Sequence, residues 1–190
     1  MADFEIVQDF PASLSRLWEA LGRRDYAERK YRALGSTSLL IRQFDSTPRR
    51  IEVRLERTLR VEPIRLPAWV LWLSGPQQRL DHHSCWTRVG AREAAVELRV
   101  SAAGRAVRAH ATGSVIELDH GHTRMRLHVT VECAVVAIGR RIADLFADQM
   151  KRALEQDHAF TVRYLAGDDA SPENAVTRSA GARRRSRSDQ

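Results

Sequence analysis

Apolar residues recur at helical spacing near the end of the chain, from residue 138 to residue 165. At about 100° per residue, one arc collects the side chains Ile138, Ile142, Phe146, Met150, Ala153, Phe160 and Tyr164. The opposite arc is charged, and Gly167 follows where a left-handed cap would end the helix. Because a helix with one apolar face packs on another element, we predict a rod of about 40 Å that lies across a sheet.

Upstream of this helix the apolar period is mostly two, which is typical of strands with one buried face. It predicts seven strands, at residues 2–9, 38–45, 51–61, 78–89, 93–101, 106–119 and 123–133. Two short helices are expected after the first strand, at 14–21 behind the capping residue Ser13 and at 24–34. Several of the links between strands are short enough for hairpins, so neighbouring strands should be antiparallel. The long helix should cover their buried face.

The segment from residue 62 to 76 breaks both patterns. Its three prolines exclude a central strand, yet residues 68–73 are strongly apolar. Trp69 and Trp72 would share one side of a short helix. Three roles remain open: a plug under the rim of the sheet, a lid over a pocket mouth, or a patch that touches a membrane or a partner.

Composition places the chain among single-domain proteins. Its 190 residues are 43% apolar, which suffices for a core. No run approaches the about 18 apolar residues that a transmembrane segment needs, and the first ten residues lack the pattern of a secretory signal. Cys85 and Cys133 lie far apart with no CxxC motif. We therefore expect a reduced, cytoplasmic protein.

The net charge of +7 comes almost entirely from arginine. Arg54, Arg57 and Arg60 are interpreted as parts of a solvent-facing strand surface, and the dense cluster falls in residues 183–187. Residues 167–190 lack periodicity and are expected to form a disordered Arg/Ser-rich tail. We predict weak, salt-sensitive attraction to polyanions but no specific nucleic-acid partner.

The order of elements, together with particular stretches, resembles a known superfamily. These stretches are FEIVQDFPASLSRLWEAL, Pro67-Ala68-Trp69, Trp86 in a middle strand, and IADLFADQMKRALEQDHAFTVRYL. Over residues 1–165 the chain is similar to the START-like (SRPBCC, Bet v 1-like) proteins, and within them to the DUF2505 group of actinobacterial proteins. The resemblance implies an α+β helix-grip domain over residues 1–166: a seven-stranded antiparallel curved sheet, two short helices after strand 1, and a long C-terminal helix packed across the sheet. It also implies an apolar cavity between sheet and helix, and supplies no catalytic residues.

The expected ligand is a small hydrophobic molecule of lipid, polyketide or isoprenoid type, which the chain would bind, sequester or transport. The sheet residues expected to line the cavity are His82, Trp86, Val96, Leu98, Leu127 and Val129. The helix residues expected to line it are Phe146, Gln149, Met150 and Ala153. Gln149 is the polar side chain best placed to meet a ligand, although contact with water or backbone at the margin would also explain it.

Two further functions stay open. One is an enzyme of cyclase or hydratase type that uses His82 or Asp157 as acid or base. The other is an interaction module that presents Trp69 and Trp72. A Ser84–His82 nucleophile is excluded, because residues two apart on a strand lie about 7 Å from each other.

Neither a metal nor a cofactor is expected. Asp119, His120 and His122 share a turn but offer only a weak metal site, since no fourth ligand is in view. The glycines are scattered singly, so the chain has no phosphate loop or dinucleotide fingerprint. The oligomeric state stays open.

Overall fold

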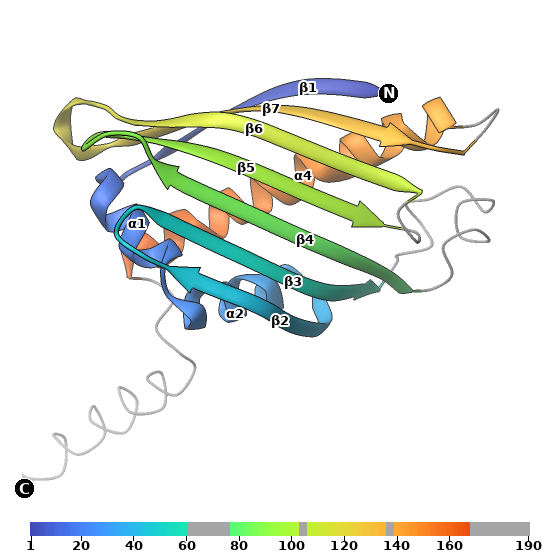
Figure 1. Cartoon of the computed structure of the whole chain (residues 1–190), viewed down its shortest axis with the longest axis horizontal. Coiled ribbons are helices and arrows are strands. Elements are labelled where there is room, and N and C mark those ends of the chain that lie inside the picture. The colour runs from blue at the N-terminus through green and yellow to red at the C-terminus, as the bar shows by residue number, and fades with distance from the viewer. Residues whose placement is uncertain (61–76, 103–105, 136–138, 168–190) are drawn as a thin grey trace, which may run out of the picture.

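A curved antiparallel sheet covered by one long helix makes up most of the molecule (Figure 1). The computed structural model describes residues 1–60, 77–102, 106–135 and 139–167. Within these ranges the elements, in chain order, are β1 (Ala2–Phe10), α1 (Leu14–Leu21), α2 (Arg24–Ala33), β2 (Ser36–Ser46), β3 (Arg50–Arg60), β4 (Gln77–Arg88), β5 (Glu93–Ala102), β6 (Val107–Glu117), the 3-10 turn η3 (Asp119–Gly121), β7 (Thr123–Cys133) and α4 (Gly139–Ala166). The seven predicted strands and three predicted helices are confirmed. The expected lid residues Trp69 and Trp72 lie outside the described residues, as does the tail from residue 168.

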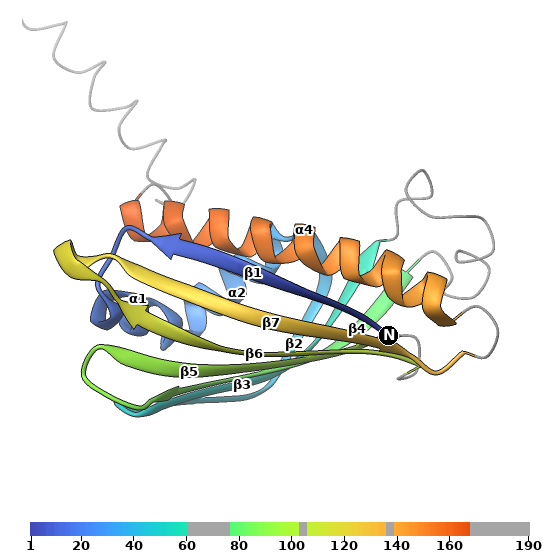
Figure 2. The same ribbon diagram turned by 90° about the horizontal axis from the view of Figure 1, so that it is seen from above.

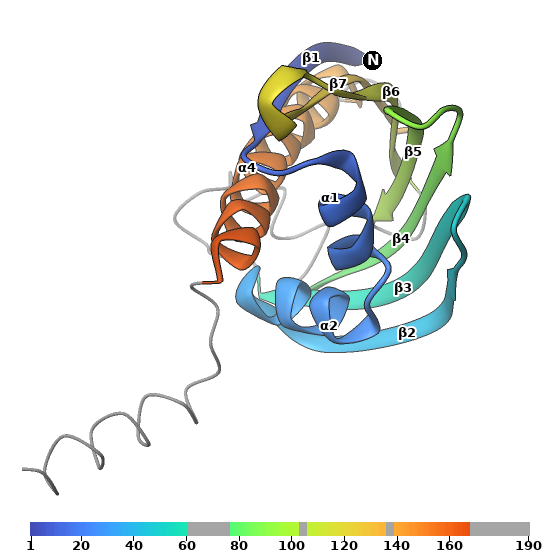
Figure 3. The same cartoon turned by 90° about the vertical axis from the view of Figure 1, so that its left-hand side faces the viewer.

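The sheet has the strand order β1-β7-β6-β5-β4-β3-β2, and every neighbouring pair is antiparallel. Consecutive strands from β2 to β7 are therefore neighbours, and β1 pairs with the last strand, with Phe4 opposite Val129. Seen along the strands, the sheet curls around an interior that the helices close (Figure 3). Side chains alternate between an inner apolar face and an outer polar face.

Helix α4 runs along the sheet close to β1 and β7 (Figure 2). Its buried residues are Gly139, Ile142, Ala143, Ala147, Leu154, Phe160, Thr161 and Leu165. The two alanines in its first half let the helix backbone approach the strands closely. Gly167, with φ +84°, ends the helix in the predicted left-handed conformation.

Helices α1 and α2 fill the space between one end of the sheet and α4 (Figure 3). Ser13 caps α1 as predicted, because its Oγ accepts a hydrogen bond from Arg16 N at 3.3 Å. Glu117 Oε2 accepts a second bond from Leu14 N at 2.8 Å. Arg16 Nη2 donates to Leu165 O at 2.7 Å, which ties α1 to the end of α4.

The outer face of the sheet is charged and largely self-compensated. Glu52 pairs with Arg50 and Arg54, and Asp9 pairs with Arg124. One expectation for this surface was wrong: Arg57 is 8% exposed and lies on the inner face. Residues three apart on a strand point to opposite faces, so Arg57 cannot share the outer surface with Arg54.

No helix in the described ranges is long and apolar enough to cross a membrane.

At Gly113 on β6 the neighbouring strand β7 leaves no room for a side chain. A Cβ there would collide with the backbone carbonyl oxygen of Arg126 and lie 2.9 Å from Leu127 Cδ2. Gly113→Ala should therefore lower the free energy of unfolding by about 3 kcal/mol, the upper part of the range for overpacking, measured by urea denaturation. The control is Gly90→Ala, where the added carbon meets only ordinary contacts and the change should stay within about 0.5 kcal/mol. Equal effects of the two substitutions would contradict the close approach.

Candidate functional site

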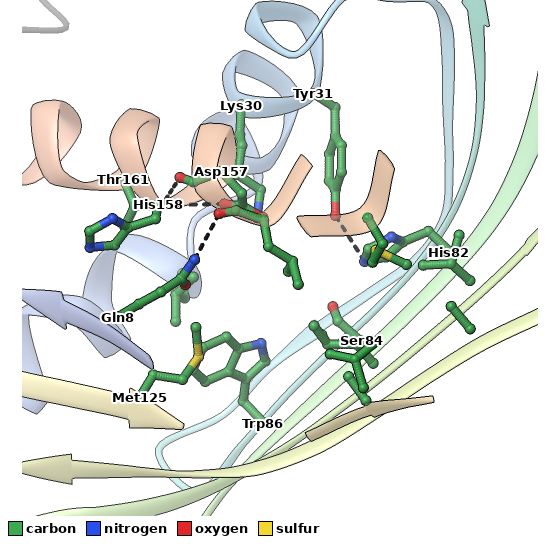
Figure 4. A pocket seen from close by; sticks show the side chains of 18 of the residues that line it. Gln8, Lys30, Tyr31, His82, Ser84, Trp86, Met125, Asp157, His158 and Thr161 are labelled. Carbon is green, nitrogen blue, oxygen red and sulfur yellow. Dashed lines mark hydrogen bonds and ion pairs between the residues drawn. The ribbon is translucent and has the colours of Figure 1, made fainter. Parts of the chain in front are cut away.

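A cavity of about 70 Å³ lies between the sheet, α2 and α4. Its apolar lining consists of Phe10, Leu17, Leu21, Leu98, Val100, Ala109, Ala111, Met125, Val129, Met150 and Leu154. The polar side chains of the lining are Gln8, Lys30, Tyr31, His82, Ser84, Asp157, His158 and Thr161. The amphipathic Trp86 also lines the cavity. Figure 4 shows the α2 side chains reaching toward the cavity from one side and the β4 side chains from the other. An apolar space with a few converging polar groups is typical of a small-molecule site.

The residues expected to line a pocket fall into two groups. His82, Trp86, Leu98, Val129 and Met150 line this cavity. The others lie elsewhere: Val96 and Leu127 are buried in the core, Phe146 packs against that core, and Gln149 and Ala153 are half-buried outside the lining.

On α4 the predicted and observed lining residues differ because the helix is rotated about its axis relative to the prediction. Close packing of Ala143 and Ala147 turns the helix so that Met150 and Asp157 face the cavity. Gln149 is thereby rotated to the margin. Asp157, His158 and Thr161, not Gln149, are the helix's polar contributions to this space.

Asp157 forms an ion pair with Lys30 across the gap between α4 and α2. Lys30 Nζ lies 3.1 Å from Asp157 Oδ2, and the two side chains are 12% and 29% exposed. Burial by itself lowers the pKa of Lys30, but the Asp157 carboxylate outweighs burial and holds this pKa above its usual value. Lys30 is therefore a cation whose charge is already matched.

A chain of hydroxyl groups supports the same helix turn. Thr161 Oγ1 donates to Asp157 O at 2.8 Å. Since its single hydrogen is used there, the 2.7 Å bond between Tyr26 Oη and Thr161 Oγ1 has Tyr26 as donor. Burial raises the pKa of Tyr26 to about 12, so this phenol keeps its proton. The C-terminal half of α4 is thus attached to α2 by polar bonds at Lys30 and at Tyr26.

Tyr31 and His82 meet at the sheet side of the cavity. Tyr31 Oη lies 3.0 Å from His82 Nε2, and the two rings form an edge contact at 5.5 Å. Burial, followed by the nearby charges of Arg57 and Lys30, lowers the pKa of His82 well below its usual value, so its imidazole is neutral. Its Nδ1 is buried without a hydrogen-bond partner among the described residues.

The tautomer of His82 follows from this asymmetry. A buried N–H without an acceptor is rarer than an acceptor without a donor. We therefore assign the hydrogen to Nε2, which donates to Tyr31 Oη. Tyr31 keeps its own hydroxyl hydrogen, because burial raises its pKa as well. That hydrogen is free to point into the cavity.

Two further polar contacts shape the end of the cavity near β1. Gln8 Nε2 donates to Leu154 O at 2.8 Å, a bond that joins β1 directly to α4. His158 Nε2 donates to Asp9 O at 2.8 Å, and its ring packs edge-on against Phe10. Both side chains are therefore already engaged by the fold.

Lys30, Tyr31 and Gln8 were missed from the sequence. Lys30 follows Tyr26 by one helical turn, which could have indicated a shared polar face on α2. The pairing of that face with Asp157 spans 127 positions and has no local signal.

No three His, Cys, Asp or Glu side chains gather as a metal site in the portion of the chain that the structure describes. His120 has φ +67° in the turn η3, and its neighbour Gly121 has φ +72°. Cys85 and Cys133 are both half-buried free thiols.

Residues 5–165 match the model of a family described as a protein of unknown function, DUF2505. The chain belongs to the DUF2505 family. A comparison with curated proteins gives no match.

Solved structures with low sequence identity share the fold of this DUF2505 member. The protein TTHA0849 from Thermus thermophilus is 15% identical, with a TM-score of 0.56 over 89% of this chain and 100% of that chain. The Zhui aromatase/cyclase from Streptomyces sp. R1128 is 15% identical, with a TM-score of 0.53 over 87% of this chain and 93% of that chain. A START superfamily protein from Mycobacterium smegmatis is 8% identical, with a TM-score of 0.51 over 85% of this chain and 98% of that chain. The helix-grip fold of the START-like superfamily, expected from the sequence, is confirmed.

The neutral state of the half-buried His82 predicts how stability depends on pH. The unfolded chain binds a proton at this residue below about pH 6.5, whereas the folded chain does not until lower pH. His82 therefore contributes a loss of stability as pH falls below about 6.5, and no change above it. His82→Gln should flatten the fall in urea midpoint between about pH 7.5 and 5.5.

His128→Gln is the matched control, because the His128 side chain is 56% exposed on the outer face. This variant should keep the wild-type pH profile. If His82→Gln and the wild type lost stability in parallel, the assignment of a neutral buried imidazole would fail.

Proposed function

We propose that this protein binds a compact, predominantly apolar small molecule in the cavity between β4, α2 and α4. The observation that carries the proposal is the lining itself: eleven apolar side chains converge with polar groups at the same enclosed space. Removal of apolar ligand surface from water would supply the affinity, at about 25 cal/mol per Å². The polar groups would orient the ligand.

The volume of the cavity restricts the ligand. An apolar cavity of about 150 Å³ binds benzene, and drug-sized ligands occupy about 300–1,000 Å³. At about 70 Å³, this cavity is smaller than one that holds benzene, so even a small member of the lipid, polyketide or isoprenoid classes would have to move lining side chains to enter. Met125 and Met150 both line it, and methionine side chains adapt their shape easily. A ligand larger than the space would gain room first by moving these two side chains.

Met150→Ala tests the proposal, because it removes side-chain atoms from the α4 wall of the cavity. We expect the variant to bind isopropylbenzene about tenfold more tightly than the wild type. The measurements are the ligand-induced rise in melting temperature and the shifts of amide resonances around Val129 and Leu98. Binding by neither protein would overturn the proposal.

Phe146→Ala is the control for this experiment. Phe146 lies on the same helix, one turn earlier, but does not line the cavity. The space it leaves should not raise the affinity for isopropylbenzene. Equal gains in both variants would show that the probe binds wherever a core side chain is removed, and would count against the cavity as the site.

An acid–base enzyme in the same cavity is the second candidate, favoured by the neutral imidazole of His82 beside Tyr31. The geometry supports it less than it supports binding. His82 Nε2 is bonded to Tyr31, its Nδ1 is buried, and Asp157 is paired with Lys30. A substrate would meet the Tyr31 hydroxyl before either proposed base.

Exchange of the methyl hydrogens of acetophenone for deuterium in D₂O separates these two functions. A binding protein should leave the exchange rate, followed by proton NMR, at its value in buffer. Acceleration by the wild type that is lost in His82→Gln and in Tyr31→Phe would establish the enzyme instead. Melting curves of both variants would verify that they remain folded.

A further inference from the structure

Strand β4 places a row of polar groups on the inner wall of the cavity. His82, Ser84 and Trp86 occupy alternate positions and so point to the same face, about 7 Å apart along the strand. Their neighbours across the sheet are apolar: Ser84 lies opposite Val53 on β3 and Leu98 on β5. Polar groups inside an apolar wall call for hydrogen-bond partners.

Two members of this row have donors that the described residues do not use. Ser84 is 8% exposed and makes no side-chain hydrogen bond in the described portion of the chain, and the same holds for Trp86 Nε1. Trp18 shows the ordinary outcome, since its Nε1 donates to Thr47 O at 3.2 Å. Figure 4 shows Ser84 and Trp86 side by side on the cavity side of the sheet.

Tyr31 adds a third donor from the opposite wall. With His82 Nε2–H bonded to Tyr31 Oη, the phenol hydrogen has no acceptor among the described side chains and lies at the cavity surface. Three O–H or N–H donors therefore converge on this space. Such an arrangement recognises an oxygen acceptor in the ligand.

The charges between α2 and α4 indicate whether the acceptor in the ligand is neutral or anionic. Lys30 is neutralised by Asp157 at 3.1 Å, so the cavity offers no free cation from this pair. An anion brought here would lose its hydration without gaining a counter-charge from it. A neutral carbonyl accepts hydrogen bonds without that cost.

We infer that the ligand is a neutral carbonyl compound, such as a small ketone, ester or amide, whose oxygen accepts hydrogen bonds from Ser84 and Trp86. This inference rests on the proposed binding function and goes beyond it by naming the recognised group. The apolar body of the ligand would lie toward Met150 and Val129. The two β4 donors would set its direction in the cavity.

The test compares acetophenone with isopropylbenzene, which has the same number of non-hydrogen atoms but no acceptor. Because the hydrocarbon leaves water more readily, the informative quantity is how each Kd changes between variants. Ser84→Ala and Trp86→Phe should each raise the Kd of acetophenone about tenfold, which corresponds to the loss of one buried hydrogen bond. Ser84→Ala should leave the Kd of isopropylbenzene within about twofold, and Trp86→Phe, which also removes atoms from the cavity wall, should not weaken its binding. Ser101→Ala, on the outer face of β5, should change neither.

An NMR signal provides a readout that packing alone would not move. The indole N–H resonance of Trp86, assigned by its loss in Trp86→Phe, should shift downfield with acetophenone and stay nearly fixed with isopropylbenzene. Melting temperatures would establish that the variants are folded. Ser84→Ala keeps the test valid if Trp86→Phe proves unstable.

The outcomes separate this inference from the proposed function. If both probes bind and the β4 variants weaken them equally or not at all, carbonyl recognition is wrong while cavity binding stands. If neither probe binds, cavity binding fails and the inference fails with it. Tighter binding of benzoate than of acetophenone would overturn the assignment of a neutral ligand.

Discussion

The fold depends on one constraint: the curved sheet has a single apolar face, and α4 must cover it. Pairing of β1 with β7 brings the first strand beside the last and gives α4 two adjacent strands to rest on. The sheet then curls away from the helix toward β2 (Figure 3). A single helix cannot fill the resulting space, so α1 and α2 close one end and a cavity remains between them and the middle strands.

The polar groups in this space are costly to bury, and the structure compensates nearly all of them. Lys30 has Asp157, Tyr26 has Thr161, and Gln8 has the carbonyl of Leu154. Buried networks of this kind are stable only when every member is satisfied. The unused groups are therefore informative. In the described ranges the buried side-chain atoms without a hydrogen-bond partner are Ser36 Oγ, Arg57 Nε, His82 Nδ1 and Arg88 Nε. Of these residues only His82 lines the cavity, on the same strand face as Ser84 and Trp86.

Much of the architecture could be predicted from the sequence, because alternation identifies a half-buried strand and short links impose antiparallel pairing. The run from Thr123 to Cys133 is the clearest example. The cavity was harder to predict. The position of the predicted apolar arc on α4 was determined mainly by large residues such as Phe160 and Tyr164. The contact with the sheet is instead made by Ala143 and Ala147, whose small side chains contribute little to a hydrophobic pattern. Lys30 and Tyr31 escaped notice because their partners lie far along the chain, and Arg57 because its face depends on strict alternation.

The two halves of α4 are held in different ways. Packing of Ala143 and Ala147 against the sheet positions the first half, where small changes in neighbouring side chains shift the helix gradually. The second half is held by hydrogen bonds and an ion pair to α2 and β1, which form at one separation and break beyond it. The cavity lies beside this second half. The separation of α4 from α2 and β1 at this end of the cavity is therefore set by hydrogen-bond and ion-pair distances.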